Sequence, residues 1–247
     1  MPKKSVGGGS GYCIELEDGK EVYRAERDNN LPSEVEHIYP DYSLYGINYS
    51  IGFLTRGCPR GCGFCHVGSK EGRCSRKVAD LDEFWKGQKN IVLCDPNILA
   101  CQDHKNLLTQ LSDSKATVEF NQGLDVRLIS DENLDLLRKV KLKKIHFAYD
   151  RIQDGGLIEP QLKAFQEATG YNRSKGNVTV YILVNYDTTI EEDLHRIEFC
   201  RSLNFQPYPM IYDKAHCDPI YRKMQRWCNP YIFWKVSRFE DYRTDVN

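Results

Sequence analysis

The sequence lacks the two features that would place it in a membrane or export it. It has no run of about eighteen apolar residues, the length that spans a bilayer as a helix. Its first residues, Met1-Pro2-Lys3-Lys4, lead into glycines and not into the apolar core of a secretion signal. We therefore predict a cytoplasmic protein without a membrane partner.

The sequence also has little net charge. Its 34 lysines and arginines stand against 35 aspartates and glutamates, which gives a formal net charge of -1. A chain with this balance has no overall field that would attract DNA, RNA or an anionic membrane. We expect no DNA binding, and any recognition by charge must be local.

Cysteine, in contrast, is plentiful, with 10 residues. In a small secreted chain such a number would indicate disulfides, but these cysteines are scattered over 247 residues and no export signal precedes them. Reduced thiols, some of them metal ligands, are the better interpretation.

From residue 51 onward, short β-branched or aromatic runs alternate with segments that carry apolar residues at helical spacing. This alternation is typical of repeated βα units around a parallel sheet, and therefore of the α/β class. It predicts six strands, at Ile51–Thr55, Ile91–Cys94, Thr117–Asn121, Lys144–Tyr149, Val178–Val184 and Tyr208–Tyr212. It predicts five helices between them, at Leu81–Gly87, Gln102–Leu111, Asp131–Val140, Leu157–Thr169 and Ile190–Leu203. These numbers suit either an open doubly wound sheet or a partly closed barrel.

Both of these folds bind their ligands at the carboxyl ends of the strands. A loop with three cysteines follows the first predicted strand, and polar residues follow the next three. These polar residues are Asp95 and Asn97, then Gln122 and Asp125, then Asp150. The sequence therefore predicts a polar pocket at this edge of the sheet.

The two ends of the chain depart from the βα pattern. Residues 1–50 read as an irregular lead-in, 51–212 as the βα core, and 213–247 as an extension rich in aromatic residues. Aromatic residues interleaved with arginine and lysine could stack on RNA bases. Packing of the extension on the core is the interpretation that we favour.

The cysteine loop carries the strongest chemical signal. Cys58, Cys62 and Cys65 are spaced so that one tight loop can turn all three thiols toward one centre, and the interspersed glycines permit the unusual backbone angles that this needs. Thiolates are the usual ligands of iron–sulfur clusters, and three of them leave one iron of a 4Fe–4S cubane without a protein ligand. Structural zinc, with His66 or Cys74 as a fourth ligand, and a redox pair of Cys62 and Cys65 are the alternatives.

The segment Thr55-Arg56-Gly57-Cys58-Pro59-Arg60-Gly61-Cys62-Gly63-Phe64-Cys65 resembles the signature of the radical S-adenosylmethionine (SAM) superfamily. The resemblance implies that the free iron binds the amino and carboxylate groups of SAM. Reduction of the cluster by a donor such as flavodoxin or ferredoxin then cleaves SAM to methionine and a 5′-deoxyadenosyl radical. It also implies a partial (βα)6 TIM-like barrel of the radical SAM type, in agreement with the six predicted strands.

A weaker resemblance extends to about residue 200. Ile91–Asp95 and Asp125-Val126-Arg127 resemble segments of radical SAM proteins that carry an upstream cobalamin-type domain, and residues 6–11 resemble the end of that domain's last strand. Only about fifty residues precede the cysteine loop, too few for several βα units of ~30 residues each. We expect a remnant of that domain, without tight binding of cobalamin.

The expected SAM contacts follow from this resemblance and from the strand ends. Phe64 is expected to lie near adenine, and the guanidinium of Arg127 to bind the SAM carboxylate. The alternative for Arg127 is a surface ion pair with Asp125 or Glu132. The remaining candidates for SAM contacts are Asp95, Asn97, Gln122, Asp125 and Asp150. The sequence departs from the family where the second strand lacks Gly-Gly-Glu and the fourth ends in Ala148-Tyr149-Asp150.

Three functions remain open from the sequence. The first is a radical SAM enzyme that acts on an unidentified small molecule, peptide or RNA. The second is a zinc-stabilised module that binds nucleic acid through its basic aromatic segment, and the third is an electron carrier. Binding of SAM separates the first from the third, because a carrier needs no SAM.

Overall fold

The computed structural model describes residues 14–17, 20–24 and 33–243. Residues 6–11, for which the sequence predicts a remnant of an upstream domain, lie outside the described residues. Among the helices of the described segments, none combines the length and the apolar character needed to cross a bilayer.

A six-stranded parallel sheet forms the centre of the molecule. The strands lie in the order β10-β9-β8-β7-β6-β3. Their bounds are Ser50–Gly52 (β3), Asn90–Leu93 (β6), Thr117–Leu124 (β7), Lys141–Ala148 (β8), Val178–Val184 (β9) and Gln206–Ile211 (β10). Because consecutive strands of the chain are neighbours and run parallel, each connection crosses the same face of the sheet, as in a barrel.

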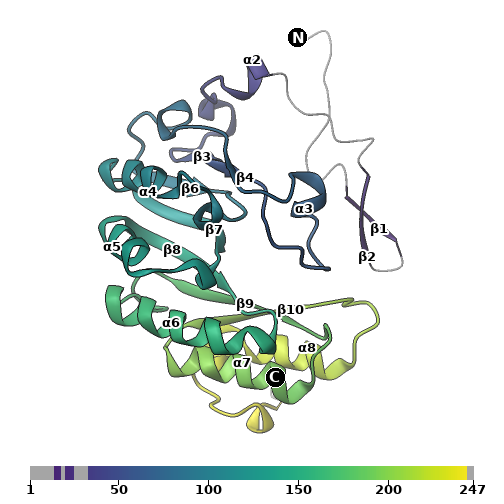
Figure 1. Ribbon diagram of the computed structural model, residues 1–247. Helices are drawn as coiled ribbons and strands as arrows, with labels where there is room; N and C mark the ends of the chain where they lie inside the picture. The colour runs from purple at the N-terminus through teal and green to yellow at the C-terminus, as the bar shows by residue number, and fades with distance from the viewer. Residues whose placement is uncertain (1–13, 18–19, 25–32, 244–247) are drawn as a thin grey trace.

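Helices cover the outer side of this curved sheet, one after the other along the chain (Figure 1). They are α4 (His104–Asp113), α5 (Asp131–Lys139), α6 (Gly155–Thr169) and α7 (Ile190–Ser202). Helix α5 begins where Ser130 accepts a hydrogen bond from the Asn133 amide, and α6 ends at Gly170, whose φ of 65° suits glycine. Apolar side chains that are fully buried between helices and sheet, such as Phe147 and Phe165, make the core.

The first crossover differs from the sequence prediction. Leu81–Gly87 does not form an α-helix but a single 3-10 turn, Leu81–Glu83. A capping box between Asp80 and Glu83 starts the turn, but Gly87, with a φ of 94°, lies outside helical geometry. The strand predicted at Ile51–Thr55 also ends early. In the structure β3 ends at Gly52, and Thr55 pairs with Lys77 outside the main sheet.

That pairing closes a long loop. Strands β4 (Thr55–Arg56) and β5 (Arg76–Lys77) form a short antiparallel ladder, and the cysteines and helix α3 (Val67–Lys70) lie between them. Upstream lie the antiparallel pair β1 (Ile14–Glu17) and β2 (Lys20–Tyr23), which the sequence pattern did not indicate, and helix α2 (Ser33–Glu36).

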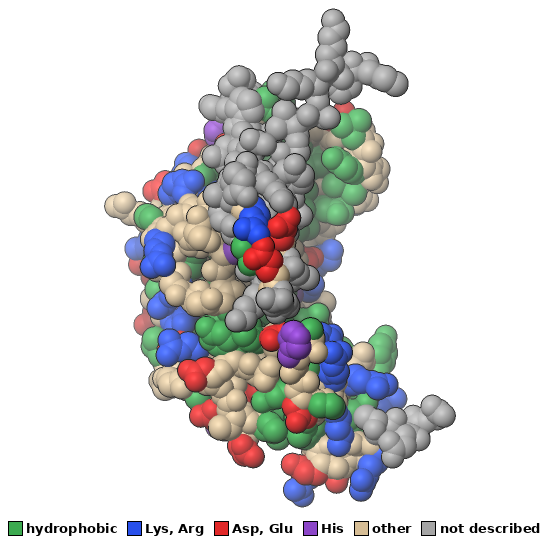
Figure 2. Space-filling model, turned by 90° about the vertical axis from the view of Figure 1, so that its right-hand side faces the viewer, with side chains coloured by type: hydrophobic (Ala, Val, Ile, Leu, Met, Phe, Trp, Pro, Cys, Tyr) green, Lys and Arg blue, Asp and Glu red, His purple; other side chains and the backbone are tan. Residues whose placement is uncertain are grey.

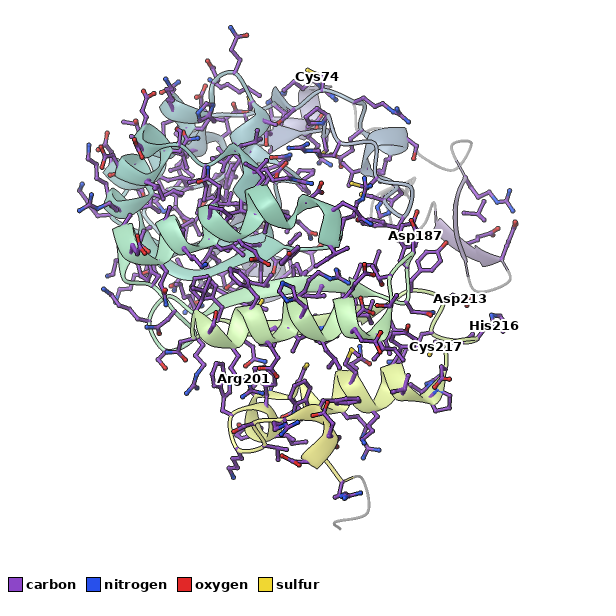
Figure 3. All side chains as sticks on the ribbon, turned by 60° about the horizontal axis from the view of Figure 1, so that its bottom comes forward. Cys74, Asp187, Arg201, Asp213, His216 and Cys217 are labelled. Carbon is purple, nitrogen blue, oxygen red and sulfur yellow. The ribbon has the colours of Figure 1, made fainter. Side chains whose placement is uncertain are left out.

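The C-terminal segment packs on β10 and α7 through helices α8 (Pro219–Trp227) and α9 (Pro230–Phe233). The indole of Trp234 donates to the side chain of Gln206 on β10 (2.9 Å), and Arg201 on α7 donates to the carbonyl of Phe233 (2.7 Å). Figure 3 shows Arg201 where α7 faces this segment. Most of its aromatic rings, including Trp227, are buried, so they are not available to stack on RNA.

Candidate active site

The base of the cysteine loop has a fixed backbone. Gly57 has a φ of 83°, and a Cβ atom at this position would lie 2.3 Å from the carbonyl oxygen of Cys74. The next amide, that of Cys58, donates to the carbonyl of Gly72 (3.1 Å). Only glycine fits where the two ends of the loop approach so closely.

Glu71 ties the same two ends together. Its carboxylate accepts from Arg56 Nη1 and from the amide of Gly57, both at 3.1 Å. Its carbonyl accepts from Arg76 Nη1 at 2.7 Å. Two arginines of this loop, Arg56 and Arg76, therefore help to hold its base closed.

The three cysteines have different exposures. Cys58 and Cys62 are half-buried and Cys65 is exposed, with the Cys65 amide donating to the Cys62 carbonyl (3.1 Å) in a tight turn. Burial raises the pKa of the Cys62 thiol, and the neighbouring Cys65 raises it further, while Arg127 opposes the shift. Arg127 is thus a cationic group near Cys62 that favours its thiolate form, against the larger effect of burial.

The donor chemistry around Cys58 fits a cluster ligand. Asn97 donates from Nδ2 to the sulfur of Cys58 (3.5 Å), and hydrogen bonds to ligand sulfurs tune iron–sulfur clusters. Asn97 is 2 % exposed, and its Oδ1 atom is buried without a partner. Among the described residues, no three His, Cys, Asp or Glu side chains form a site for one metal ion. A cubane does not require that arrangement, because each thiolate ligates a different iron atom.

Asp125 joins the loop to the sheet. Its Oδ2 atom accepts from Arg60 Nε in the loop (2.8 Å), and its Oδ1 atom accepts from Arg127 Nε (2.7 Å). Arg127 also donates to Asp154 (2.9 Å). Burial favours the neutral form of Asp125, but the hydrogen bonds from Arg127 and Arg60 outweigh it, so the pKa lies below its ordinary value.

Asp95 lies at the end of β6 and is 3 % exposed. Its carboxylate accepts from the amides of Leu54 and Thr55 and from the Thr55 hydroxyl (2.7 Å). Burial raises the pKa of Asp95 to about 6, although these hydrogen bonds oppose the shift. The carboxylate therefore holds the chain as it leaves β3 for the cysteine loop, and a SAM contact of Asp95 stays a prediction.

Asp150 follows the end of β8, and Gln122 lies in the last part of β7. Asp150 accepts from the amide of Leu183 (3.0 Å), and burial raises its pKa. Gln122 is exposed on an irregular part of β7, where the pairing with β8 shifts between Phe120 and Leu124. No recorded contact joins Gln122 to the other candidates within the described residues, whereas Asn97, Asp125 and Arg127 form one connected group.

A cavity of about 400 Å³ lies beside the loop, within the range of ligand pockets. The loop lines it with residues 60–64, which include Cys62 and Phe64, and the sheet lines it with Arg127. The loops after β8 and β9 add residues 151, 153 and 154 and residues 186–188. Thus the cavity joins the cysteine loop to the carboxyl ends of three strands.

Sequence reasoning missed three residues in this cavity. Tyr186 packs edge-on against Phe64, with ring centroids 5.2 Å apart, and a Cβ atom on Gly63 would meet its hydroxyl at 2.7 Å. Asp187 and Arg151 line the same cavity. The signal was their place directly after predicted strands, the criterion that found Asp125. Figure 3 places Cys74 at the outer edge of the molecule, well apart from Asp187.

No protein-family model matches the sequence, and no curated protein matches it. Solved structures of Streptococcus suis SuiB are similar to it in fold. SuiB bound to S-adenosylmethionine has a TM-score of 0.51 and 14% sequence identity, and the match covers 82% of this chain and 47% of that chain. SuiB bound to the precursor peptide SuiA has a TM-score of 0.53 and 15% identity, over 82% and 48% of the two chains.

The chain spans about half the length of the SuiB chains it matches. A likeness at this identity establishes the fold. The predicted fold class is confirmed: the chain is an α/β protein whose six parallel strands form a partial barrel, a fold similar to that of SuiB.

Proposed function

We propose that this protein is a radical SAM enzyme that holds a 4Fe–4S cluster on Cys58, Cys62 and Cys65. One observation carries the proposal: Cys62 and Phe64 line the same cavity as Arg127 and the loops after β8 and β9. A nucleoside in this cavity would lie against the cysteine loop. When bound, the cluster and SAM supply an electron and a 5′-deoxyadenosyl radical.

The chain's own residues hold and orient these groups. The three thiolates ligate the cluster, and Asn97 donates a hydrogen bond to Cys58. Phe64, fixed by Tyr186, offers a ring beside the adenine. Asp125 and Arg127 lie at the sheet side of the cavity, while Asp95 and Asp150 stabilise the backbone around it. Gln122 stays a candidate on its position after the central part of β7 alone.

The substrate is proposed to be a peptide or a small molecule. The peptide class is supported by the similar fold of SuiB, which has been crystallised with its precursor peptide SuiA. Because most C-terminal rings are buried, that segment offers few rings on which RNA bases could stack. The electron donor is proposed to be a flavodoxin or a ferredoxin.

Anaerobic reconstitution followed by reduction with dithionite in the presence of SAM tests the proposal. We expect four irons per chain and slow formation of 5′-deoxyadenosine without the substrate. Replacing Cys58, Cys62 and Cys65 together by alanine should abolish iron, sulfide and 5′-deoxyadenosine.

Cys217→Ala and Cys74→Ala are the matched controls, and both should keep the full cluster. Loss of metal in Cys74→Ala, with zinc in the purified protein, would favour the zinc alternative. A triple variant that keeps a complete cluster, or a four-iron protein that yields no 5′-deoxyadenosine above a cluster-free control, contradicts the proposal.

A further inference from the structure

Three guanidinium groups line the cavity, those of Arg60, Arg127 and Arg151. Two of them already have carboxylate partners. Arg60 pairs with Asp125 at 2.8 Å, and Arg127 pairs with Asp125 at 2.7 Å and with Asp154 at 2.9 Å. The positive charge of these two arginines is thus largely offset within the protein.

Arg151 is different. It lies directly after Asp150, between the end of β8 and the 3-10 turn Ile152–Asp154, and its side chain is exposed. The structure records no hydrogen bond, ion pair or ring contact of this side chain with any described residue. Asp187 lines the same cavity, yet no ion pair joins it to Arg151.

An arginine without a partner binds an anion more readily than one that must first give up a salt bridge. Its planar fork matches the two oxygens of a carboxylate, and such charge-assisted pairs are the strong ones. Arg127 would have to leave Asp125 or Asp154 to offer both donors to a ligand. Leaving Asp154 would remove the counter-charge of that carboxylate, and leaving Asp125 would remove one of the two arginines that pair with it.

We propose that Arg151 binds the carboxylate of the methionine moiety of SAM, and that Arg127 is a positioning residue that holds Asp125 and Asp154. This inference rests on the proposed function. It assigns to Arg151 the contact that the sequence suggested for Arg127. The loop after β8 thereby sets the orientation of the ligand over the cysteine loop.

The test compares two nucleosides that differ in the amino-acid moiety. S-adenosylhomocysteine carries the carboxylate, and 5′-methylthioadenosine lacks it. Reconstituted protein is titrated with each by calorimetry. In Arg151→Gln, the affinity for S-adenosylhomocysteine should fall roughly 10- to 100-fold, as for loss of a charged hydrogen bond, while that for 5′-methylthioadenosine stays unchanged. Arg151→Lys should recover part of the loss.

Arg127→Gln gives a different expected result. Because it releases Asp125 and Asp154, it should weaken binding of both nucleosides and lower the thermal stability as well. Arg226→Gln, an exposed arginine on α8 outside the cavity, is the matched control and should change neither affinity.

The outcomes separate this inference from the proposed function. If the unmodified protein binds neither nucleoside, the proposed function fails. If it binds both equally, or if Arg151→Gln keeps the unmodified ratio of the two affinities, the assignment of Arg151 is overturned while SAM binding stands. A loss in Arg127→Gln that is confined to S-adenosylhomocysteine would return the carboxylate contact to Arg127.

Discussion

The first crossover of the sheet and the later ones are built differently. Between β3 and β6 the chain forms only short elements, the two-residue strands β4 and β5, the four-residue helix α3 and a 3-10 turn. Between β7 and β10 it forms three regular helices, α5, α6 and α7, of 9, 15 and 13 residues. Figure 1 shows this difference between the loop-rich end and the helical end of one sheet.

Burial follows the same division. In the first crossover Cys65 and Cys74 are exposed, whereas in the later units whole side chains such as Ile158, Leu162 and Phe165 are fully buried. The later units therefore carry most of the hydrophobic stabilisation. The first crossover has its cysteine thiols at or near the surface, and a few contacts at the base of the loop, such as those of Glu71, hold it in place.

The outline of the molecule is hollowed along one edge when it is viewed from the side of β1 and β2, and lysine and arginine side chains lie beside the hollow (Figure 2).

The largest effect on stability is expected in the helical region. Phe165 on α6 is fully buried, and its ring packs against that of Phe147 with centroids 4.9 Å apart. Phe165→Ala should lower the free energy of unfolding by about 3–5 kcal/mol, as large-to-small core substitutions do. Urea unfolding of the cluster-free protein measures this change.

Leu157→Ala on the same helix is the control. Leu157 is 49 % exposed, so the change should stay within about 0.5 kcal/mol. Equal effects of the two substitutions would show that the helical units do not carry the stability of the molecule.

The second prediction concerns Asp95, which joins the two regions from the end of β6. Its pKa of about 6 lies above the ordinary value of 3.8, so between these pH values the folded protein keeps a proton that the unfolded chain has released. The free energy of unfolding should therefore fall as pH rises through this window, by on the order of 3 kcal/mol.

The measurement compares urea unfolding of the unmodified protein and of Asp95→Asn at pH 4.5 and pH 7. Other carboxylates titrate in both proteins, so the difference between the two reports Asp95. This difference should favour the unmodified protein more at pH 4.5 than at pH 7. Parallel pH profiles would mean that burial does not raise the pKa of Asp95.

The same two regions explain what the sequence could predict. Runs of mostly β-branched and apolar residues such as Val178–Val184 marked the buried strands well, because both faces of a parallel strand are covered. The end of α6 was predicted at Thr169, where Gly170 stops the helix. In the first crossover, apolar spacing alone suggested a helix at Leu81–Gly87, but only one turn forms there.

The candidate site was partly predictable for a similar reason. Strand ends bring Asn97, Asp125 and Arg127 together because parallel strands end at one edge of the sheet. Which residues of the later loops turn over the cavity depends on contacts between distant segments, such as Tyr186 with Phe64, and no local pattern encodes these. Gln122 is the converse case, because it lies on a part of β7 whose pairing with β8 is irregular, and the sequence pattern did not indicate this irregularity.

The smallest effect on overall stability is expected in the cysteine loop, where Gly57→Ala should act locally. Alanine at a φ of 83° is strained by about 1–3 kcal/mol, and its Cβ atom would press on the carbonyl oxygen of Cys74. The strand β4 and the loop must then separate, so Cys58 moves relative to Cys62 and Cys65. Iron content after reconstitution should fall to a minor fraction, while the circular dichroism of the sheet and helices stays unchanged.

Gly87→Ala is the control that separates backbone strain from displacement of the cysteine loop. Gly87 has a similar φ of 94°, but nothing lies within 4 Å of a Cβ atom placed there. The two substitutions therefore impose a similar backbone penalty, and only Gly57→Ala adds a clash with the loop. If both lower the iron content equally, general destabilisation explains the loss and the closed base of the loop does not matter. If only Gly57→Ala lowers the iron content, the positions of the cysteines depend on the close approach of Gly57 to the Cys74 carbonyl. Cluster binding at the loop-rich end of the sheet then depends on backbone geometry more than on burial.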